Sequence, residues 1–241
     1  MQIQKTNLPL KIDFAFEFTK KIMIDTNYIN SLEIENFIWD WNGTLLDDVE
    51  VNVRTVNDML LKRGLSQLDM ATYKEQFCFP VKTFQSLVGF DFEKEPFEEV
   101  AIEYHSTYKQ YENEIKLNED ALFVIDMLYK QGASQYILSA AMQEVLVKML
   151  KSFNIADKFN GIYGISDAHA SGKIERGKQL MKENALDPTK TLIIGDTLHD
   201  AEVAKDLGVN YLLYSGGHNS HELLSKNAKV IGSLRELVSF G

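Results

Sequence analysis

The sequence predicts an α/β protein with a doubly wound, Rossmann-like parallel sheet, and two patterns carry this prediction. Short apolar runs recur along the chain and end at or beside Gly, Asp or Ser, at 37–41, 135–139, 161–165, 191–195 and 209–214. Segments with helical periodicity lie between or after these runs, at 119–131, 142–152, 173–184 and 200–207. Strands that are apolar at nearly every position are typical of a parallel sheet that helices cover on both faces.

The first two apolar runs lie too far apart for one crossover helix. Nearly a hundred residues separate Asp40 from Ser139, and a structureless loop of that length is implausible. The intervening chain is rich in aromatic residues and has helical periodicity at 49–62, 70–77, 81–88 and 93–111. We therefore expect a helical cap at 48–115, inserted into a catalytic core of 36–47 and 116–241. Such a cap would lie over the carboxyl ends of the strands, where open α/β sheets bind ligands.

The N-terminal extension, residues 1–35, is harder to interpret. Apolar and polar residues alternate over 12–19, which is the period of a strand, but an Asn-containing polar stretch follows. An added edge strand and a loose arm are both compatible with this pattern.

The composition limits the classes of partner. The 241 residues are 45% hydrophobic, which is enough for a sizeable core, and the charge of 25 Lys and Arg against 35 Asp and Glu is −10. This charge disfavours nucleic acid, and we find no apolar stretch of the ~18 residues that a membrane span needs. The single cysteine, Cys78, indicates a reducing compartment. We expect a cytoplasmic monomer or homodimer that acts on a small molecule, without a nucleic-acid or membrane partner.

Acidic residues follow the first and fourth apolar runs. Asp40 ends the first run, and a carboxylate there can attack phosphorus to form an acyl-phosphate, although it could equally cap the next helix. The fourth run is followed by Asp196 and, four residues later, Asp200. If the two strands are neighbours, Asp40 and Asp196 converge and repel unless a hard divalent ion such as Mg²⁺ lies between them. Asp200 could hold a metal-bound water or order the turn.

Two further polar residues are expected near this edge of the sheet. Ser139 ends the second run, and its hydroxyl and the amide of Ala140, opening the next helix, could bind a phosphoryl oxygen. Lys173 opens a later helix, where a cation is unfavourable with the helix dipole unless an anion lies nearby. A plain helix cap and an exposed lysine are the alternative interpretations.

Taken in order, these motifs resemble those of the haloacid dehalogenase superfamily over residues 36–241. The resemblance is most specific in Asp-Trp-Asn-Gly-Thr-Leu-Leu-Asp-Asp at 40–48 and Gly-Asp-Thr-Leu-His-Asp at 195–200. The helical insertion resembles the cap of the phosphoglycolate-phosphatase-like branch. The resemblance implies a Mg²⁺-dependent phosphatase that hydrolyses a small phosphorylated metabolite through an aspartyl-phosphate.

The resemblance also assigns roles to residues. It makes Asp40 the nucleophile, and it places Ser139 and Lys173 on the transferred phosphoryl group, with Gly43 and Ala140 beside it. It makes Asp40, Asp196 and the backbone carbonyl of Asn42 ligands of Mg²⁺, with Asp200 supporting them.

Asn42 departs from the family pattern. The family's phosphatases usually have an Asp two residues after the nucleophile as general acid for the leaving alcohol, and an amide cannot donate a proton in that way. Asn42 can still hydrogen-bond the substrate, so we expect phosphoryl binding to survive while poor leaving groups depart slowly. An Asp at position 42 is expected to restore acid catalysis unless Asp40 repels it.

Two other functions stay open. A relative of phosphonoacetaldehyde hydrolase would cleave a carbon–phosphorus bond without that acid, but it needs a desolvated cap lysine, for which Lys62, Lys74 and Lys82 are candidates. A catalytically impaired phosphate-binding protein is the other alternative, and the retained acids argue against it. We expect His199 to face solvent and His218 to lie in a loop at the rim of the cleft.

Overall fold

The computed structural model describes residues 33–165 and 172–238. The expectations for the N-terminal extension therefore fall almost entirely outside the described residues. None of the helices within these two ranges is long and apolar enough to cross a membrane.

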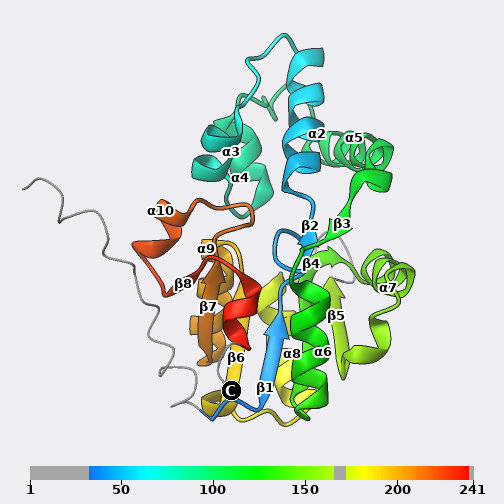
Figure 1. Cartoon of the computed structure of the whole chain (residues 1–241). Helices are drawn as coiled ribbons and strands as arrows, with labels where there is room; N and C mark the ends of the chain where they lie inside the picture. Colours follow the sequence, from blue (N-terminus) through cyan, green and yellow to red (C-terminus); the bar gives the residue numbers. More distant parts are fainter. Residues whose placement is uncertain (1–32, 166–171, 239–241) are drawn as a thin grey trace, which may run out of the picture.

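Six parallel strands form the central sheet, in the order β5-β4-β1-β6-β7-β8 (Figure 1). They are β1 (Asn36–Trp39), β4 (Ser134–Met142), β5 (Gly161–Ile165), β6 (Thr191–Gly195), β7 (Asn210–Tyr214) and β8 (Val230–Ile231). The chain runs outward from β1 to β5, then crosses back to β6 on the other side of β1. The carboxyl end of β1 therefore lies at the switch point of the sheet, where such folds bind ligands.

Helices cover both faces of this sheet. The helices of the core are α6 (Ala121–Lys130), α7 (Gln143–Ser152), α8 (Lys173–Glu183), α9 (Leu198–Leu207) and α10 (His221–Ser225), with short 3-10 helices at η2 (Ala156–Lys158), η3 (Pro188–Lys190) and η4 (Leu234–Leu237). Buried residues of α6, α7 and η4 pack on one face of the sheet, and those of α8 and α9 pack on the other. The predicted fold class is confirmed.

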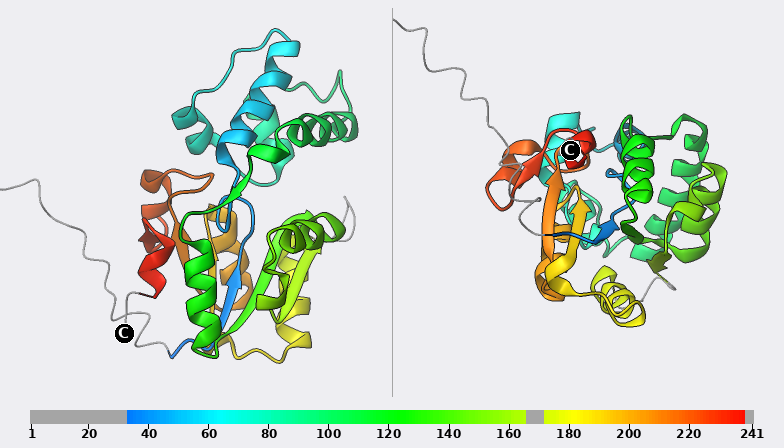
Figure 2. Two further views of the ribbon diagram at one scale, coloured as in Figure 1. Left: turned by 45° about the vertical axis from the view of Figure 1, so that its right-hand side comes forward. Right: turned by 60° about the horizontal axis from the view of Figure 1, so that its bottom comes forward.

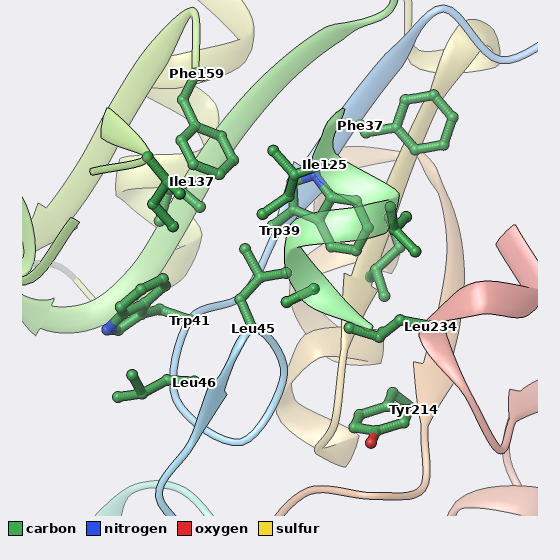
Figure 3. Close-up of a cluster of buried hydrophobic side chains, with 14 of the residues drawn as sticks. Phe37, Trp39, Trp41, Leu45, Leu46, Ile125, Ile137, Phe159, Tyr214 and Leu234 are labelled. Atoms are coloured by element: carbon green, nitrogen blue, oxygen red, sulfur yellow. The ribbon is translucent and has the colours of Figure 1, made fainter. Parts of the chain in front are cut away.

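The alternation along β1 shows why both faces are apolar. Phe37 and Trp39 point to the face that Ile125 of α6 covers (Figure 3). Ile38 points to the opposite face and packs with Leu180 of α8. Because both faces of the strand are buried, every one of its central positions is apolar.

The cap rises above the carboxyl ends of the strands (Figures 1 and 2). It contains α2 (Val49–Lys62), α3 (Met70–Gln76), α4 (Val81–Leu87) and α5 (Phe97–Gln110), followed by η1 (Glu112–Glu114). These helices fall inside the segment expected for the cap and share their own hydrophobic cluster, which includes Met59, Leu60, Tyr73 and Phe84. The two connections between cap and core pair as short antiparallel strands, β2 (Leu46–Asp47) and β3 (Lys116–Leu117).

Some local expectations were wrong. Strand β4 continues past Ser139 to Met142, so Ala140 lies in a strand and does not open the next helix, which begins at Gln143. The pairing of β4 with β5 shifts register between Leu138 and Met142, which lets the strand extend past the expected end. The pair β2–β3, strand β8 and helix α10 were not expected, since each is too short to show a period in the sequence.

Two neighbouring leucines of α2 test whether the cap has a core of its own. Leu60 is 0% exposed and Leu61 is 63% exposed. We expect Leu60→Ala to lower the free energy of unfolding by ~2–5 kcal/mol through the cavity it leaves, and Leu61→Ala by less than ~0.5 kcal/mol. Urea denaturation followed by circular dichroism measures both, and equal losses would contradict this description of the cap.

Candidate active site

Three buried carboxylates meet at the carboxyl ends of β1 and β6. Asp40 directly follows β1, and its backbone N–H donates to the carbonyl of Ile194 at 2.8 Å. Asp196 directly follows β6, and Asp200 lies in the first turn of α9. One oxygen from each of the three carboxylates lies within 4.8 Å of the others. Strands β1 and β6 pair directly in the sheet, and the predicted meeting of Asp40 and Asp196 depends on this pairing.

Lys173, the first residue of α8, is the cation of this cluster. Its ammonium group is buried and forms ion pairs with Asp40 and Asp200. Burial alone would lower the pKa of Lys173, but the charges of Asp200 and Asp40 raise it above its ordinary value. The two anions explain how a lysine occupies the N-terminus of a helix against the helix dipole.

Asp200 orders the turn that carries Asp196. Its second oxygen accepts hydrogen bonds from the backbone N–H and hydroxyl of Thr197, at 2.9 and 2.7 Å, and from the N–H of Asp196 at 3.2 Å. Burial would raise the pKa of Asp200, but the charge and hydrogen bond of Lys173 lower it below its ordinary value. Of the two roles that the sequence left open for Asp200, ordering the turn is the one that these hydrogen bonds perform.

Thr44 bridges the other two acids. Its hydroxyl lies 3.0 Å from an oxygen of Asp196 and 3.3 Å from an oxygen of Asp40. The remaining oxygen of Asp196 accepts the backbone N–H of His218 at 2.6 Å. Sequence reasoning did not single out Thr44, although it lies inside the motif at 40–48.

The charges of the cluster are only partly balanced. Burial is the largest cause that raises the pKa of Asp40 well above its ordinary value; the charge of Lys173 lowers it in part, and repulsion by Asp200 and Asp196 raises it further. Burial also raises the pKa of Asp196. Two buried carboxylates that resist ionisation, with all donor atoms oxygen, fit a hard divalent cation such as Mg²⁺. The donor set at this edge of the sheet is therefore compatible with the expected metal.

The loop after Asp40 is pressed against Asp196. Gly43 has a φ of +77°, and a Cβ atom at this position would lie 2.3 Å from Oδ2 of Asp196 and 2.4 Å from Cδ2 of His218. Only glycine fits a left-handed conformation with so little space around it. The loop therefore approaches the acid cluster as closely as the backbone allows.

Asp48, at the start of α2, is a buried acid that sequence reasoning missed. Its carboxylate accepts hydrogen bonds from Nδ2 of Asn42 at 2.7 Å and from Tyr108 at 2.8 Å, and lies 3.4 Å from Nε2 of His218. Burial would raise the pKa of Asp48, but His218, Asn42 and Tyr108 lower it below its ordinary value. The sequence offered one signal, a second acid beside Asp47 directly before a helix.

His218 lies deeper than expected. Its side chain is buried, with Nδ1 2.9 Å from the hydroxyl of Tyr73 and the ring centroid 4.9 Å from that of Phe77. Burial would lower the pKa of His218, but Asp48 raises it above its ordinary value. His199 was also placed wrongly, since it stacks on Phe79 of the cap instead of facing only solvent.

The loop after β7 joins the cap to the core. Asn219 accepts the backbone N–H of Leu198 at 3.0 Å and donates to the carbonyl of Phe77 at 2.8 Å. The ammonium of Lys74 donates to the carbonyl of Gly216 at 3.3 Å. These bonds hold α3 of the cap next to the turn that carries Asp196.

Ser139 lies on the strand beside β1. The register pairs Trp39 with Ile137, so Ser139 is at nearly the same level of the sheet as Asp40. Its side chain is buried, and its hydroxyl oxygen accepts the N–H of Ala141 at 3.0 Å. The structure thus gathers Asp40, Lys173 and Asp196 in direct contact or close to it, with Ser139 on the adjoining strand.

Comparison with known families agrees with this arrangement. Residues 37–214, more than half of the chain, match the haloacid dehalogenase-like hydrolases. The chain belongs to this family. The family predicted from the sequence, and a hydrolase of the phosphatase type, are confirmed.

Two relatives from Pseudomonas species are distant in sequence. A 5'-nucleotidase of Pseudomonas aeruginosa is 26% identical over 202 residues, covering 80% of this chain and 88% of its own. A phosphoglycolate phosphatase of Pseudomonas fluorescens is 24% identical over 212 residues, covering 83% and 77%. Among solved structures, a haloacid dehalogenase-like hydrolase of Streptococcus pneumoniae superimposes with a TM-score of 0.66 at 23% identity, covering 86% and 98%, which shows the shared fold.

Two glycines separate backbone strain from crowding at the site. Gly43 and Gly64 both have positive φ, +77° and +66°, but a Cβ atom at Gly64 would meet nothing within 4 Å. We expect both alanine variants to lose ~1–2 kcal/mol of unfolding free energy through strain. Gly43→Ala should also displace the loop and lower hydrolysis of an aryl phosphate ~100-fold, because a 1 Å misplacement has an effect of that order. Normal turnover by Gly43→Ala would contradict the close packing of this loop.

Proposed function

We propose that the protein is a Mg²⁺-dependent phosphatase that hydrolyses a small phosphorylated metabolite through an aspartyl-phosphate at Asp40. The observation that carries the proposal is the cluster at the switch point of the sheet. There a buried carboxylate lies with a lysine and two further acids at the carboxyl ends of adjoining strands. The names of the two Pseudomonas relatives, both phosphate-ester hydrolases, support the same reaction.

Each residue of the cluster has a step in this reaction. The carboxylate of Asp40 attacks phosphorus, the bond from phosphorus to the leaving oxygen breaks, and water then hydrolyses the acyl-phosphate. Lys173 and Ser139 hold the phosphoryl oxygens, with the backbone at Gly43 and Ala140 beside them. Asp40, Asp196 and the carbonyl of Asn42 would hold Mg²⁺, with Asp200 in support. The bound ion would offset negative charge on the phosphoryl group.

The cap supports a small, anionic substrate. The half-buried ammonium of Lys74 donates to the carbonyl of Gly216, in the loop after β7. The charges of Asp196 and Asp47 raise the pKa of Lys74 and so oppose the effect of its burial, which places the ammonium on the side of the cap that faces the site. A cation on the cap whose charge interacts with that of Asp196 suits a substrate with a second anionic group. A short phosphorylated carboxylic acid, similar to phosphoglycolate, has both charges.

Carbon–phosphorus cleavage is the second candidate, and Lys74 is the residue that favours it. Lys62 is exposed and pairs with Glu103, and Lys82 lies over the rings of Phe92 and Phe97. Burial lowers the pKa of Lys74, as an imine-forming amine requires. Turnover of phosphonoacetaldehyde that borohydride blocks would support this reaction, whereas turnover of phosphomonoesters alone supports the phosphatase.

The nucleophile is tested by an isosteric change. We expect Asp40→Asn to fold normally and to lose on the order of 10⁴-fold or more in kcat, because the amide cannot attack phosphorus. Steady-state hydrolysis of p-nitrophenyl phosphate measures the loss. Asp206→Asn, at an exposed ion pair with Lys178, is the matched control and should keep full activity. A folded Asp40→Asn variant with substantial turnover would refute the covalent mechanism.

The metal is tested by removal and by titration. We expect excess EDTA to abolish hydrolysis and added Mg²⁺ to restore it, because the buried acids otherwise repel the substrate's phosphate. Isothermal titration calorimetry should show Mg²⁺ binding to the unmodified protein and much weaker binding to Asp196→Ala. Full activity in chelator would exclude the metal from the reaction.

A further inference from the structure

Asp48 gathers hydrogen-bond donors from four segments of the chain. The loop after β1 contributes Nδ2 of Asn42 at 2.7 Å and the backbone N–H of Gly43 at 2.9 Å. The cap contributes Nδ2 of Asn52 from α2 and the hydroxyl of Tyr108 from α5, both at 2.8 Å. The loop after β7 contributes Nε2 of His218 at 3.4 Å. Two of these segments belong to the cap and two to the core. These donors suit the ionised side chain of Asp48, because both oxygens of a carboxylate accept hydrogen bonds, whereas an amide has only one accepting oxygen.

Two short paths connect Asp48 to the acid cluster. The first runs through Asn42 and Gly43, which form the loop between Asp40 and the cap. The second runs through His218, whose backbone N–H holds Asp196 at 2.6 Å. The carboxylate of Asp48, at the junction of cap and core, therefore fixes both the loop that follows Asp40 and the loop whose backbone binds Asp196.

The same contact explains why an amide stands at position 42. Nδ2 of Asn42 donates to Oδ2 of Asp48 at 2.7 Å, so an acid at the half-buried position 42 would place a second carboxylate in contact with the buried one of Asp48. Like charges at this distance repel strongly when they are shielded from water. The sequence predicted repulsion from Asp40, but the carboxylate that contacts the Asn42 amide is that of Asp48.

We propose that Asp48 is a positioning residue of the reaction: it holds the Asn42–Gly43 loop and the cap in register with Asp40, and its charge is what requires a neutral donor at position 42. This inference rests on the proposed phosphatase function. It reverses one expectation from the sequence, because Asn42→Asp alone should impair the enzyme and not improve it.

A double-mutant cycle tests the pairing of these two residues. The variants are Asn42→Asp, Asp48→Asn, and the exchange variant that carries both substitutions. The exchange variant keeps one amide and one carboxylate in contact, but the amide donor is then at position 48 and the acceptor at position 42. We expect Asn42→Asp to lower kcat/KM for p-nitrophenyl phosphate ~100-fold and the exchange to recover at least ~10-fold of that loss, within the usual range of coupling between contacting residues. Circular dichroism confirms that each variant is folded at the assay temperature.

A matched pair of tyrosines tests the same role without changing charge. Tyr108 donates to Asp48, and Tyr111 donates to Asp58 on the same helix α2, away from the cluster. We expect Tyr108→Phe to lower kcat ~10-fold or more, in the range that the loss of one hydrogen bond to a charged group implies, and Tyr111→Phe to leave it within twofold. A role in stability alone would lower the melting temperature and leave kcat of the folded enzyme unchanged for both.

The outcomes separate this inference from the proposed function. If the unmodified protein hydrolyses no phosphate ester, the proposed function fails and the positioning role fails with it. If the unmodified enzyme is active but the two substitutions act additively, or Asn42→Asp is as active as the unmodified enzyme, only the role of Asp48 is overturned. Recovery in the exchange variant, together with a selective effect of Tyr108→Phe, supports it.

Discussion

The arrangement of the site depends on the crowding of buried negative charge at the carboxyl end of β1. Asp40, Asp196 and Asp200 approach within 4.8 Å of one another with little access to water, and their mutual repulsion would expel them unless cations compensated it. Lys173 supplies one positive charge, which is shared between one carboxylate oxygen of Asp200 and one of Asp40. Burial, together with the neighbouring acids, raises the pKa values of Asp40 and Asp196, so these two carboxylates need further positive charge to be ionised, which a divalent ion would supply.

A second set of buried charges connects this cluster to the cap. Asp48 and His218 lie at the domain junction, and hydrogen bonds from Asn52 and Tyr108 extend the network into α2 and α5. The network ties the position of the cap to the conformation of the loops that hold the acids. The cap and the acid cluster of the core therefore have a physical link through a few polar contacts.

Most of the fold and most residues of the candidate site could be predicted from the sequence, and the features that could not be predicted have physical reasons. The five longer strands of the central sheet and most helices were foreseen, because buried strands such as β6 (Thr191–Gly195) are apolar at nearly every position. The acids of the motifs at 40–48 and 195–200 stand at strand ends, where a parallel sheet gathers them. The role of Asp48 and the burial of His218 could not be foreseen, because their contacts come from segments up to 170 residues apart in the sequence that only the folded cap and core bring together. The extension of β4 past Ser139 was missed because it depends on a register shift against β5, to which no local period corresponds.

The central claim is that Asp40 becomes phosphorylated during turnover, and the most direct measurement is the chemical trapping of that species. The enzyme is mixed with a rapidly hydrolysed aryl phosphate and Mg²⁺, quenched in acid within one turnover, and digested for peptide mass spectrometry. A covalent mechanism at Asp40 predicts a phosphoryl group on the side chain of Asp40 in the peptide that contains it, and no phosphoryl group on that peptide in Asp40→Asn. A phosphoryl group on Ser139 or His218 instead, in an enzyme that turns over normally, would contradict it.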